Sequence, residues 1–141
     1  MSGETFEDLV ETFEFMDDWE DRYRYVIDLG KQLPPMDDGL KNPVTKVDGC
    51  ASQVWLVPSI EGDGGERRLT FDGDSDAMIV RGLIAILRIL LSGRRPEEIA
   101  AADPMAAFAQ LGLDQHLSAQ RSNGLRAMIE RLRALAAAAA A

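Results

Sequence analysis

Cysteine and histidine are almost missing from this 141-residue sequence, which contains one of each, Cys50 and His116. A single cysteine cannot form an internal disulfide, so a reducing compartment, the cytoplasm, is the expected setting of the protein. One thiol and one imidazole are too few to ligate a structural zinc ion or a protein-held iron–sulfur cluster. We therefore expect no metal site of this kind in the chain.

Basic residues are also scarce, with 15 Lys and Arg against 24 Asp and Glu and a formal net charge of -9. Binding to nucleic acid or to an anionic membrane calls for a basic face, so we expect neither partner. The longest apolar run, Met78–Leu91, is too short to span a bilayer and contains Arg81 and Arg88. The N-terminal residues are acidic and lack the basic start of a secretory signal.

What the sequence does have is enough apolar content, 46% of its residues, for one core in a single domain over residues 1–141. Residues 1–16 place apolar side chains at helical spacing among many carboxylates, which predicts an acidic N-terminal helix. Its acidic face is either simply solvated or a docking surface for a basic partner. A second helix is expected from Asp17 or Asp18 to about Leu29, with Gly30 at the C′ position just past its end.

The middle of the chain predicts a small antiparallel sheet of three strands, at Val44–Val47, Ser52–Ile60 and Arg67–Asp72. The triplet Asp74-Ser75-Asp76 is expected to cap a central buried helix from about Ala77 to Leu91, which is apolar nearly all round. Shorter helices should begin at the prolines that follow, and a last helix should follow Ser118. Residues 134–141 are almost all alanine and predict a helical tail that frays. The expected class is α+β.

The chemically most telling stretch is Val47–Trp55, which holds Cys50 directly after Gly49. Glycine permits positive φ, so the thiol should lie on a turn that leads into a strand. A lone cysteine is more often a small buried hydrophobe than a nucleophile. Here, however, Asp48 and Ser52 make the surroundings polar. A thiol in such a turn could attack a sulfur electrophile by thiol exchange.

Two expectations concern the environment of this thiol. The sulfur should tuck against the apolar runs on either side of the turn, Val44–Val47 and Val54–Val57. Lys46 and Arg121 should lower the pKa of Cys50 if the fold brings them close. A hydrolase would need a base within reach, and His116 is the one imidazole. It lies in a turn before the last helix, where a capping or packing role is the commoner one.

The stretch Val47–Trp55 resembles the signature of the SufE family, the cysteine desulfuration proteins of iron–sulfur cluster assembly. Other segments between about Asp17 and Arg133 resemble the same family. They are Trp19–Tyr23, Leu29–Pro34, Asp74–Ala77, Ile79–Leu83, Gln115–Ser118 and Arg121–Leu125. One departure is Thr45, where many members carry an asparagine; the nearest asparagine here is Asn42.

The resemblance implies a sulfur-transfer protein that carries no cofactor of its own and is not an independent enzyme. Such a protein accepts sulfane sulfur from a pyridoxal-phosphate-dependent cysteine desulfurase of the SufS or CsdA kind, which it stimulates. It then passes the sulfur on, usually to a SufB-containing scaffold. The implied fold is a three-stranded antiparallel sheet packed by helices, similar to the NifU N-terminal (IscU-like) fold. Because the chain lacks the further cysteines of IscU-like scaffolds, it should carry sulfur and not assemble a cluster. A weak homodimer stays open.

By the same resemblance, Cys50 is the persulfide carrier, and Asp76 and Arg121 lie near the desulfurase contact. Gly49, Ser52 and Gln53 are expected to position the loop around the thiol. Two other functions remain open from the residues alone. One is a thiol redox sensor or one-cysteine peroxidase that uses Cys50 against peroxide. The other is an interaction domain with an inert cysteine.

Overall fold

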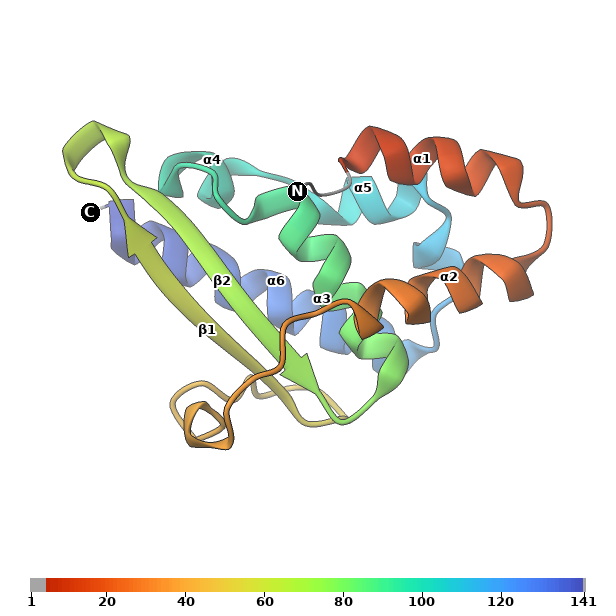
Figure 1. Ribbon diagram of the computed structural model, residues 1–141, viewed down its shortest axis with the longest axis horizontal. Coiled ribbons are helices and arrows are strands. Elements are labelled where there is room, and N and C mark those ends of the chain that lie inside the picture. Colours follow the sequence, from red (N-terminus) through yellow and green to blue (C-terminus); the bar gives the residue numbers. More distant parts are fainter. Residues whose placement is uncertain (1–4, 141) are drawn as a thin grey trace.

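The computed structural model describes residues 5–140 and combines helices with a small antiparallel sheet, which confirms the predicted α+β class (Figure 1). The main elements are α1 (Phe6–Phe15), α2 (Trp19–Lys31), β1 (Val54–Glu61), β2 (Arg68–Ser75), α3 (Met78–Leu91), α4 (Pro96–Ala101), α5 (Pro104–Gln110) and α6 (Ala119–Ala140). Short 3-10 turns lie at Asp38–Leu40, Gly64–Glu66 and Leu113–Gln115.

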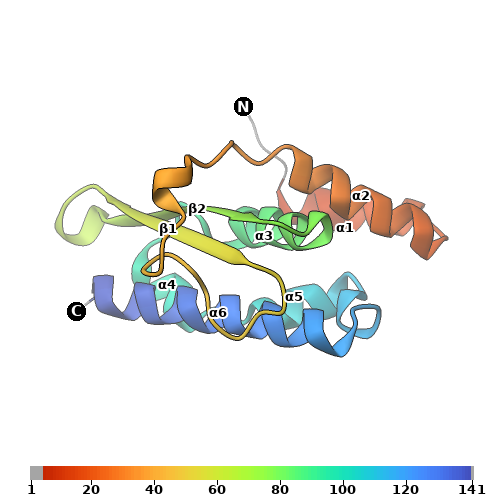
Figure 2. The same cartoon turned by 90° about the horizontal axis from the view of Figure 1, so that it is seen from below.

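Helix α3 lies at the centre of the molecule, as its apolar sequence predicts. Nine of its residues are buried, among them Leu83 and Ile86. Figure 2 shows α3 and the β1–β2 hairpin as a middle layer. Helices α1 and α2 lie on one side of this layer, and α4, α5 and α6 lie on the other. Helix α4 packs against α6, which runs on through the alanine tail to Ala140 and buries Ala136. Residues 134–140 are therefore helical, and Ala136 packs into the core.

The sheet in residues 5–140 has two strands, β1 and β2, so the predicted third strand at Val44–Val47 is wrong. That segment joins β1 only through an isolated bridge between Lys46 and Trp55. The reason lies just before it. The Asn42 side chain accepts hydrogen bonds from the amides of Val44 (2.9 Å) and Thr45 (3.1 Å) and so folds the backbone into a turn.

Two glycines allow α2 and α3 to cross at close range. A Cβ atom built on Gly82 would overlap the carbonyl oxygen of Val26, and one built on Gly30 would lie 2.6 Å from the Gly82 amide nitrogen. The C′ position predicted for Gly30 is therefore wrong, because α2 continues to Lys31. Gly30 is needed inside the helix because its missing side chain lets the backbones approach.

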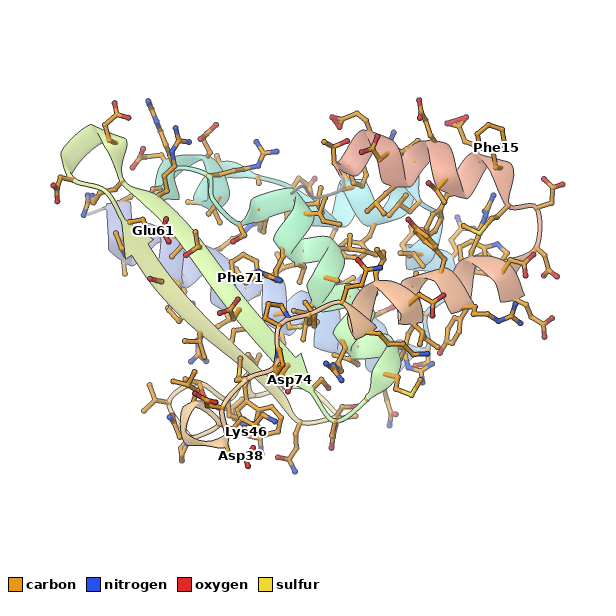
Figure 3. All side chains as sticks on the ribbon, viewed as in Figure 1. Phe15, Asp38, Lys46, Glu61, Phe71 and Asp74 are labelled. Carbon is orange, nitrogen blue, oxygen red and sulfur yellow. The ribbon has the colours of Figure 1, made fainter. Side chains whose placement is uncertain are left out.

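The predicted cap of α3 is also wrong in detail. Asp74 and Ser75 belong to β2, and the N-cap residue Ala77 makes no side-chain capping bond. Asp74 instead forms ion pairs with Lys41 (3.1 Å) and Arg81 (3.2 Å), near the end of β2 where Figure 3 labels it. The carboxylate therefore ties the loop before β1 to the first turns of α3.

The glycine crossing predicts that Gly82→Ala destabilises the protein by roughly 1–3 kcal/mol, because the added methyl group must push α2 away from α3. Gly39→Ala is the matched control, since a Cβ at Gly39 would meet no atom within 4 Å. Urea unfolding followed by circular dichroism measures both. A Gly82→Ala midpoint equal to that of Gly39→Ala would contradict the crossing.

Candidate functional site

Cys50 lies on a loop that runs from the turn at residues 42–46 into β1. Gly49 precedes it with φ +91, a left-handed conformation that glycine adopts freely, so the predicted turn is confirmed. The Cys50 side chain is half-buried, and its Sγ lies 3.6 Å from the carbonyl oxygen of Gly124, within range for the thiol to donate a weak hydrogen bond. The loop thus places the thiol against α6.

Small residues on α6 lie beside the thiol and its loop. A Cβ on Gly124 would lie 3.5 Å from Cys50 Sγ, and one on Gly49 would lie 3.4 Å from the Cβ of Ala127. A larger side chain at position 124 would occupy the space beside the sulfur. Sequence reasoning missed Gly124 as a site residue, although a glycine in the middle of a helix is a signal for close packing.

A cavity of about 340 Å³ opens beside the thiol. Its apolar wall comes from β1, α3 and α6, and its polar lining includes Ser52 and Arg121. The lining residues are Cys50, Ala51, Ser52, Val54, Val80, Leu83, Ser118, Gln120, Arg121, Gly124, Leu125 and Met128. Of the runs expected to shelter the sulfur, Val54 takes part, but most of the apolar wall is contributed by the two helices.

Asp76 lies at the other end of the cysteine loop. Its Oδ1 accepts a hydrogen bond from the Gln53 amide at 3.0 Å, and its own amide donates to the Gln53 carbonyl oxygen at 3.3 Å. These two bonds join the loop to the connection between β2 and α3. The structure therefore brings Asp76 and Gln53 together, just where β1 begins.

Arg121 approaches the thiol from the first turn of α6. It lines the cavity, and its Nη1 donates a 2.7 Å hydrogen bond to the Tyr23 hydroxyl on α2. The guanidinium also lies 5.9 Å from the centre of the Tyr23 ring. Arg121 is thereby held between α2 and the cavity.

Arg131 supports the turn that precedes the cysteine loop. Its guanidinium donates to the carbonyl oxygens of Val44 and Lys46 from two turns further along α6 than Gly124. Together with the Asn42 turn, this contact holds the N-terminal side of the loop. Asn42, the asparagine nearest to Thr45 in the sequence, therefore supplies side-chain hydrogen bonds to this turn.

Burial raises the pKa of the Cys50 thiol, and the negative charge of Asp48 raises that pKa further. The expectation that Lys46 and Arg121 lower the pKa is therefore wrong. The Lys46 side chain is exposed, and Arg121 is bonded to Tyr23. At neutral pH the resting thiol is protonated, which suits its role as hydrogen-bond donor to Gly124.

His116 is a packing residue in this structure. Its ring stacks on Trp19 with centroids 3.6 Å apart and planes 15° apart, and its Nδ1 lies 3.0 Å from the Gly112 carbonyl oxygen. His116 is not among the residues that line the cysteine cavity. The geometry gives no support to a cysteine hydrolase with His116 as base.

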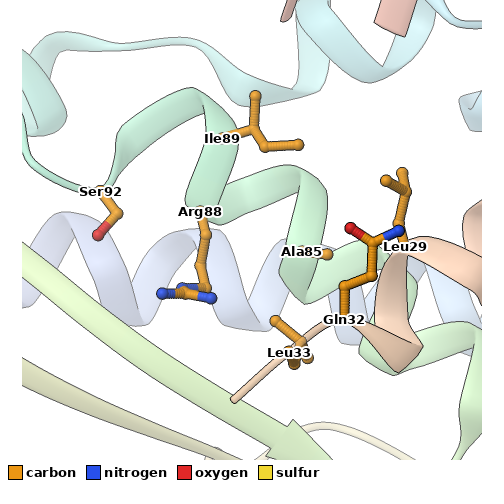
Figure 4. A pocket seen from close by; sticks show the side chains of 7 residues that line it. All are labelled: Leu29, Gln32, Leu33, Ala85, Arg88, Ile89 and Ser92. Atoms are coloured by element: carbon orange, nitrogen blue, oxygen red, sulfur yellow. The ribbon is translucent and has the colours of Figure 1, made fainter. Parts of the chain in front are cut away.

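A second cavity, of about 390 Å³, lies between α2 and α3 and contains none of the candidate residues (Figure 4). Its lining residues are Leu29, Gln32, Leu33, Ala85, Arg88, Ile89 and Ser92. Within residues 5–140 no cluster of His, Cys, Asp and Glu is arranged to hold a metal ion. Over the same residues, no helix combines the length and the apolarity needed to cross a membrane.

Residues 7–136 match the family model SufE, described as the Fe-S metabolism associated domain. The chain belongs to the SufE family. This membership places it in iron–sulfur metabolism, with a sulfur-transfer role, and confirms the resemblance seen in the sequence.

Other SufE-like proteins are similar over nearly the whole chain. An uncharacterized SufE-like protein of Rhizobium meliloti (strain 1021) is 51% identical over 129 residues, which cover 92% of this chain and 92% of that protein. An uncharacterized SufE-like protein of Rhizobium etli is 52% identical over 129 residues, which cover 92% of this chain and 87% of that protein. A hypothetical protein from Thermus thermophilus, solved in solution, shares the fold with a TM-score of 0.69 at 24% identity, covering 95% of this chain and 94% of that one.

The Asp76 contact predicts that Asp76→Ala speeds alkylation of Cys50 by iodoacetamide roughly tenfold, because a hydrogen bond to a charged acceptor that closes the loop is lost. The remaining backbone bond to Gln53 limits the effect. Asp63→Ala is the matched control, an exposed aspartate in the hairpin connection that makes no capping bond. Equal alkylation rates in the two variants would mean that Asp76 does not restrain the loop.

The raised thiol pKa makes a separate prediction for Asp48→Asn. Removing the negative charge lowers the pKa of Cys50, so the pH profile of alkylation moves to lower pH. Burial still keeps that pKa above the value of an ordinary thiol. Asp63→Asn makes the same charge change at the far end of β1 and should leave the profile where it is. A profile of Asp48→Asn that coincides with the parent would contradict the Coulombic cause.

Proposed function

We propose that this protein accepts sulfane sulfur on Cys50 from a pyridoxal-phosphate-dependent cysteine desulfurase and passes it on for iron–sulfur cluster assembly. The observation that carries the proposal is the position of the thiol. It lies on a glycine turn at the rim of a cavity lined by both apolar and polar side chains, 3.6 Å from a backbone carbonyl oxygen. A group placed in this way can be sheltered or presented by a small movement of one loop.

The transfer conserves atoms and electrons. Cys50 loses its proton, and its thiolate attacks the outer sulfur of a persulfide on the desulfurase. A new S–S bond forms on Cys50, the S–S bond of the donor breaks, and the donor cysteine leaves as a thiolate that takes up a proton. No net oxidation occurs. By removing the desulfurase product, the acceptor stimulates that enzyme without being an independent catalyst.

The raised pKa of Cys50 fits an acceptor that works only with its partner. In the free protein the buried, protonated thiol is a poor nucleophile. Movement of the loop away from α6 would rehydrate the sulfur and remove the contact with Gly124. Asp76 would set the resistance of the loop to this movement through its bond to Gln53, and Gly49 would provide the flexible joint. Ser52 would contribute a polar group at the cavity rim.

We place Arg121 at the contact with the desulfurase. Its guanidinium is exposed and forked, so it can bind carboxylates or carbonyl oxygens of a partner. The downstream acceptor would be a SufB-containing scaffold, as the family pattern suggests. A chain with one cysteine, which can form no internal disulfide, suits a reducing compartment such as the cytoplasm.

A redox sensor or one-cysteine peroxidase has less support. Reaction with peroxide requires the thiolate, and peroxidatic or sensor cysteines have lowered pKa values. Here burial and Asp48 act in the opposite direction. We therefore propose sulfur transfer as the function of Cys50.

Cys50→Ser tests the proposal, because serine is nearly isosteric but cannot carry a persulfide. We expect the variant to melt like the parent and to lose both sulfur acceptance and desulfurase stimulation. The parent, mixed with a cysteine desulfurase and L-cysteine, should gain the mass of one sulfur atom on Cys50. Stimulation that survives in Cys50→Ser would overturn the acceptor role. Oxygen adducts formed only with peroxide would favour the sensor instead.

A further inference from the structure

Arg121 is the one charged side chain among the described residues that line the cysteine cavity, and it is bonded to a residue on another helix, α2. Its Nη1 is bonded to the Tyr23 hydroxyl at 2.7 Å, and the guanidinium also lies near the Tyr23 ring. Tyr23 itself lies outside the cavity lining. Neither the sequence pattern nor the proposed transfer step assigns it a task.

The helix geometry places Arg121 within reach of the sulfur. Residues 121 and 124 are three apart on α6 and so face the same side, with Cβ positions about 5–6 Å apart. A Cβ on Gly124 would lie 3.5 Å from Cys50 Sγ. The long arginine side chain spans this separation, so its guanidinium can meet a group that extends from Cys50 into the cavity.

Loading Cys50 with sulfur changes the hydrogen bonding and the charge that the cavity must accommodate. The resting thiol donates to the Gly124 carbonyl oxygen. A persulfide adds one sulfur about 2.0 Å beyond Sγ, and its outer sulfur is more acidic than a thiol. The resulting anion cannot donate to Gly124 and is left beside an apolar wall, where an unpaired charge is costly. Asp48 adds a further negative charge on the same loop. Arg121 is the cation in the cavity lining that can compensate the charge of the persulfide.

We propose that Tyr23 is a positioning residue for the loaded protein, a role that rests on the proposed sulfur transfer. Its hydroxyl holds Arg121 at the cavity, so that the guanidinium is shared between the Tyr23 oxygen and the outer sulfur of a Cys50 persulfide. The arginine fork has several N–H donors and can serve both acceptors together. In this arrangement α2 acts on the sulfur through one side chain of α6.

The test loads the parent chemically and needs no desulfurase. Dithiobis-nitrobenzoate converts Cys50 to a mixed disulfide and releases one thionitrobenzoate. Hydrosulfide then attacks the Cys50 sulfur, breaks the mixed disulfide and expels the second thionitrobenzoate, which leaves a persulfide on Cys50. Iodoacetamide alkylates the outer sulfur as its anion and loses iodide. The pH at which alkylation reaches half its maximal rate reports the acidity of that sulfur.

We expect the outer sulfur to become about tenfold less acidic in Arg121→Ala, as for loss of an opposite charge within 4–6 Å, and less acidic by a smaller factor in Tyr23→Phe. Tyr25→Phe is the matched control, with the same loss of a hydroxyl from α2. The double variant Tyr23→Phe, Arg121→Ala should match Arg121→Ala alone, because Tyr23 acts only through the arginine.

Two results would overturn the role of Tyr23. One is a Tyr23→Phe profile that coincides with those of the parent and Tyr25→Phe. The other is a Tyr23→Phe effect that persists in full in the Arg121→Ala background. Failure of the proposed function is a separate result: the parent would then take no sulfur from a desulfurase, while the chemically loaded proteins would still report on Tyr23.

Discussion

The close crossing of α2 and α3 is the constraint on which the arrangement of this protein depends. Without side chains at Gly30 and Gly82, the two backbones can touch, and α3 can bury apolar residues on nearly every side. This contact fixes α2 relative to the layer that carries the hairpin. It therefore also determines where the aromatic residues of α2 meet the start of α6. The glycine crossing thus determines both the packing of the core and the position of α2 beside the cysteine cavity.

The cysteine site balances shelter against reactivity. The loop is held at its start by Asn42 and Arg131 and at its end by Asp76, while the thiol rests on the bare backbone of Gly124. Each contact is one or two hydrogen bonds or a small apolar contact, and a hydrogen bond contributes only about 0.5–1.5 kcal/mol net, or about 1.5–3 kcal/mol with a charged group. A partner surface can replace contacts of this size. The site is thus ordered when alone and inexpensive to rearrange.

Local sequence patterns predicted most of the helices, the hairpin and the turn at Cys50, because periodicity, proline and glycine act over a few residues. The wrong predictions concern residues whose contacts lie far away in the sequence. Gly30 resembled a helix end because its reason for being glycine, the approach of Gly82, lies 52 positions away. Asp74 resembled a cap because Lys41 and Arg81 could not be placed near it. The direction of the thiol pKa shift depends on burial by α3 and α6, which no local pattern reports.

The bridge at Lys46 has a consequence for how the hairpin behaves in a crowded solution. The outer edge of β1 is used by Val54 and Leu56, whose backbone groups bond Val47 (2.8 Å) and Thr45 (2.9 Å). Since alternate residues point to the same edge, the next outward amide would belong to Pro58, which has none. One half of the edge is covered, and in the other half Pro58 removes one of the two outward amides and leaves that of Ile60. The outer edge of β1 is thereby a poor template on which foreign strands could aggregate.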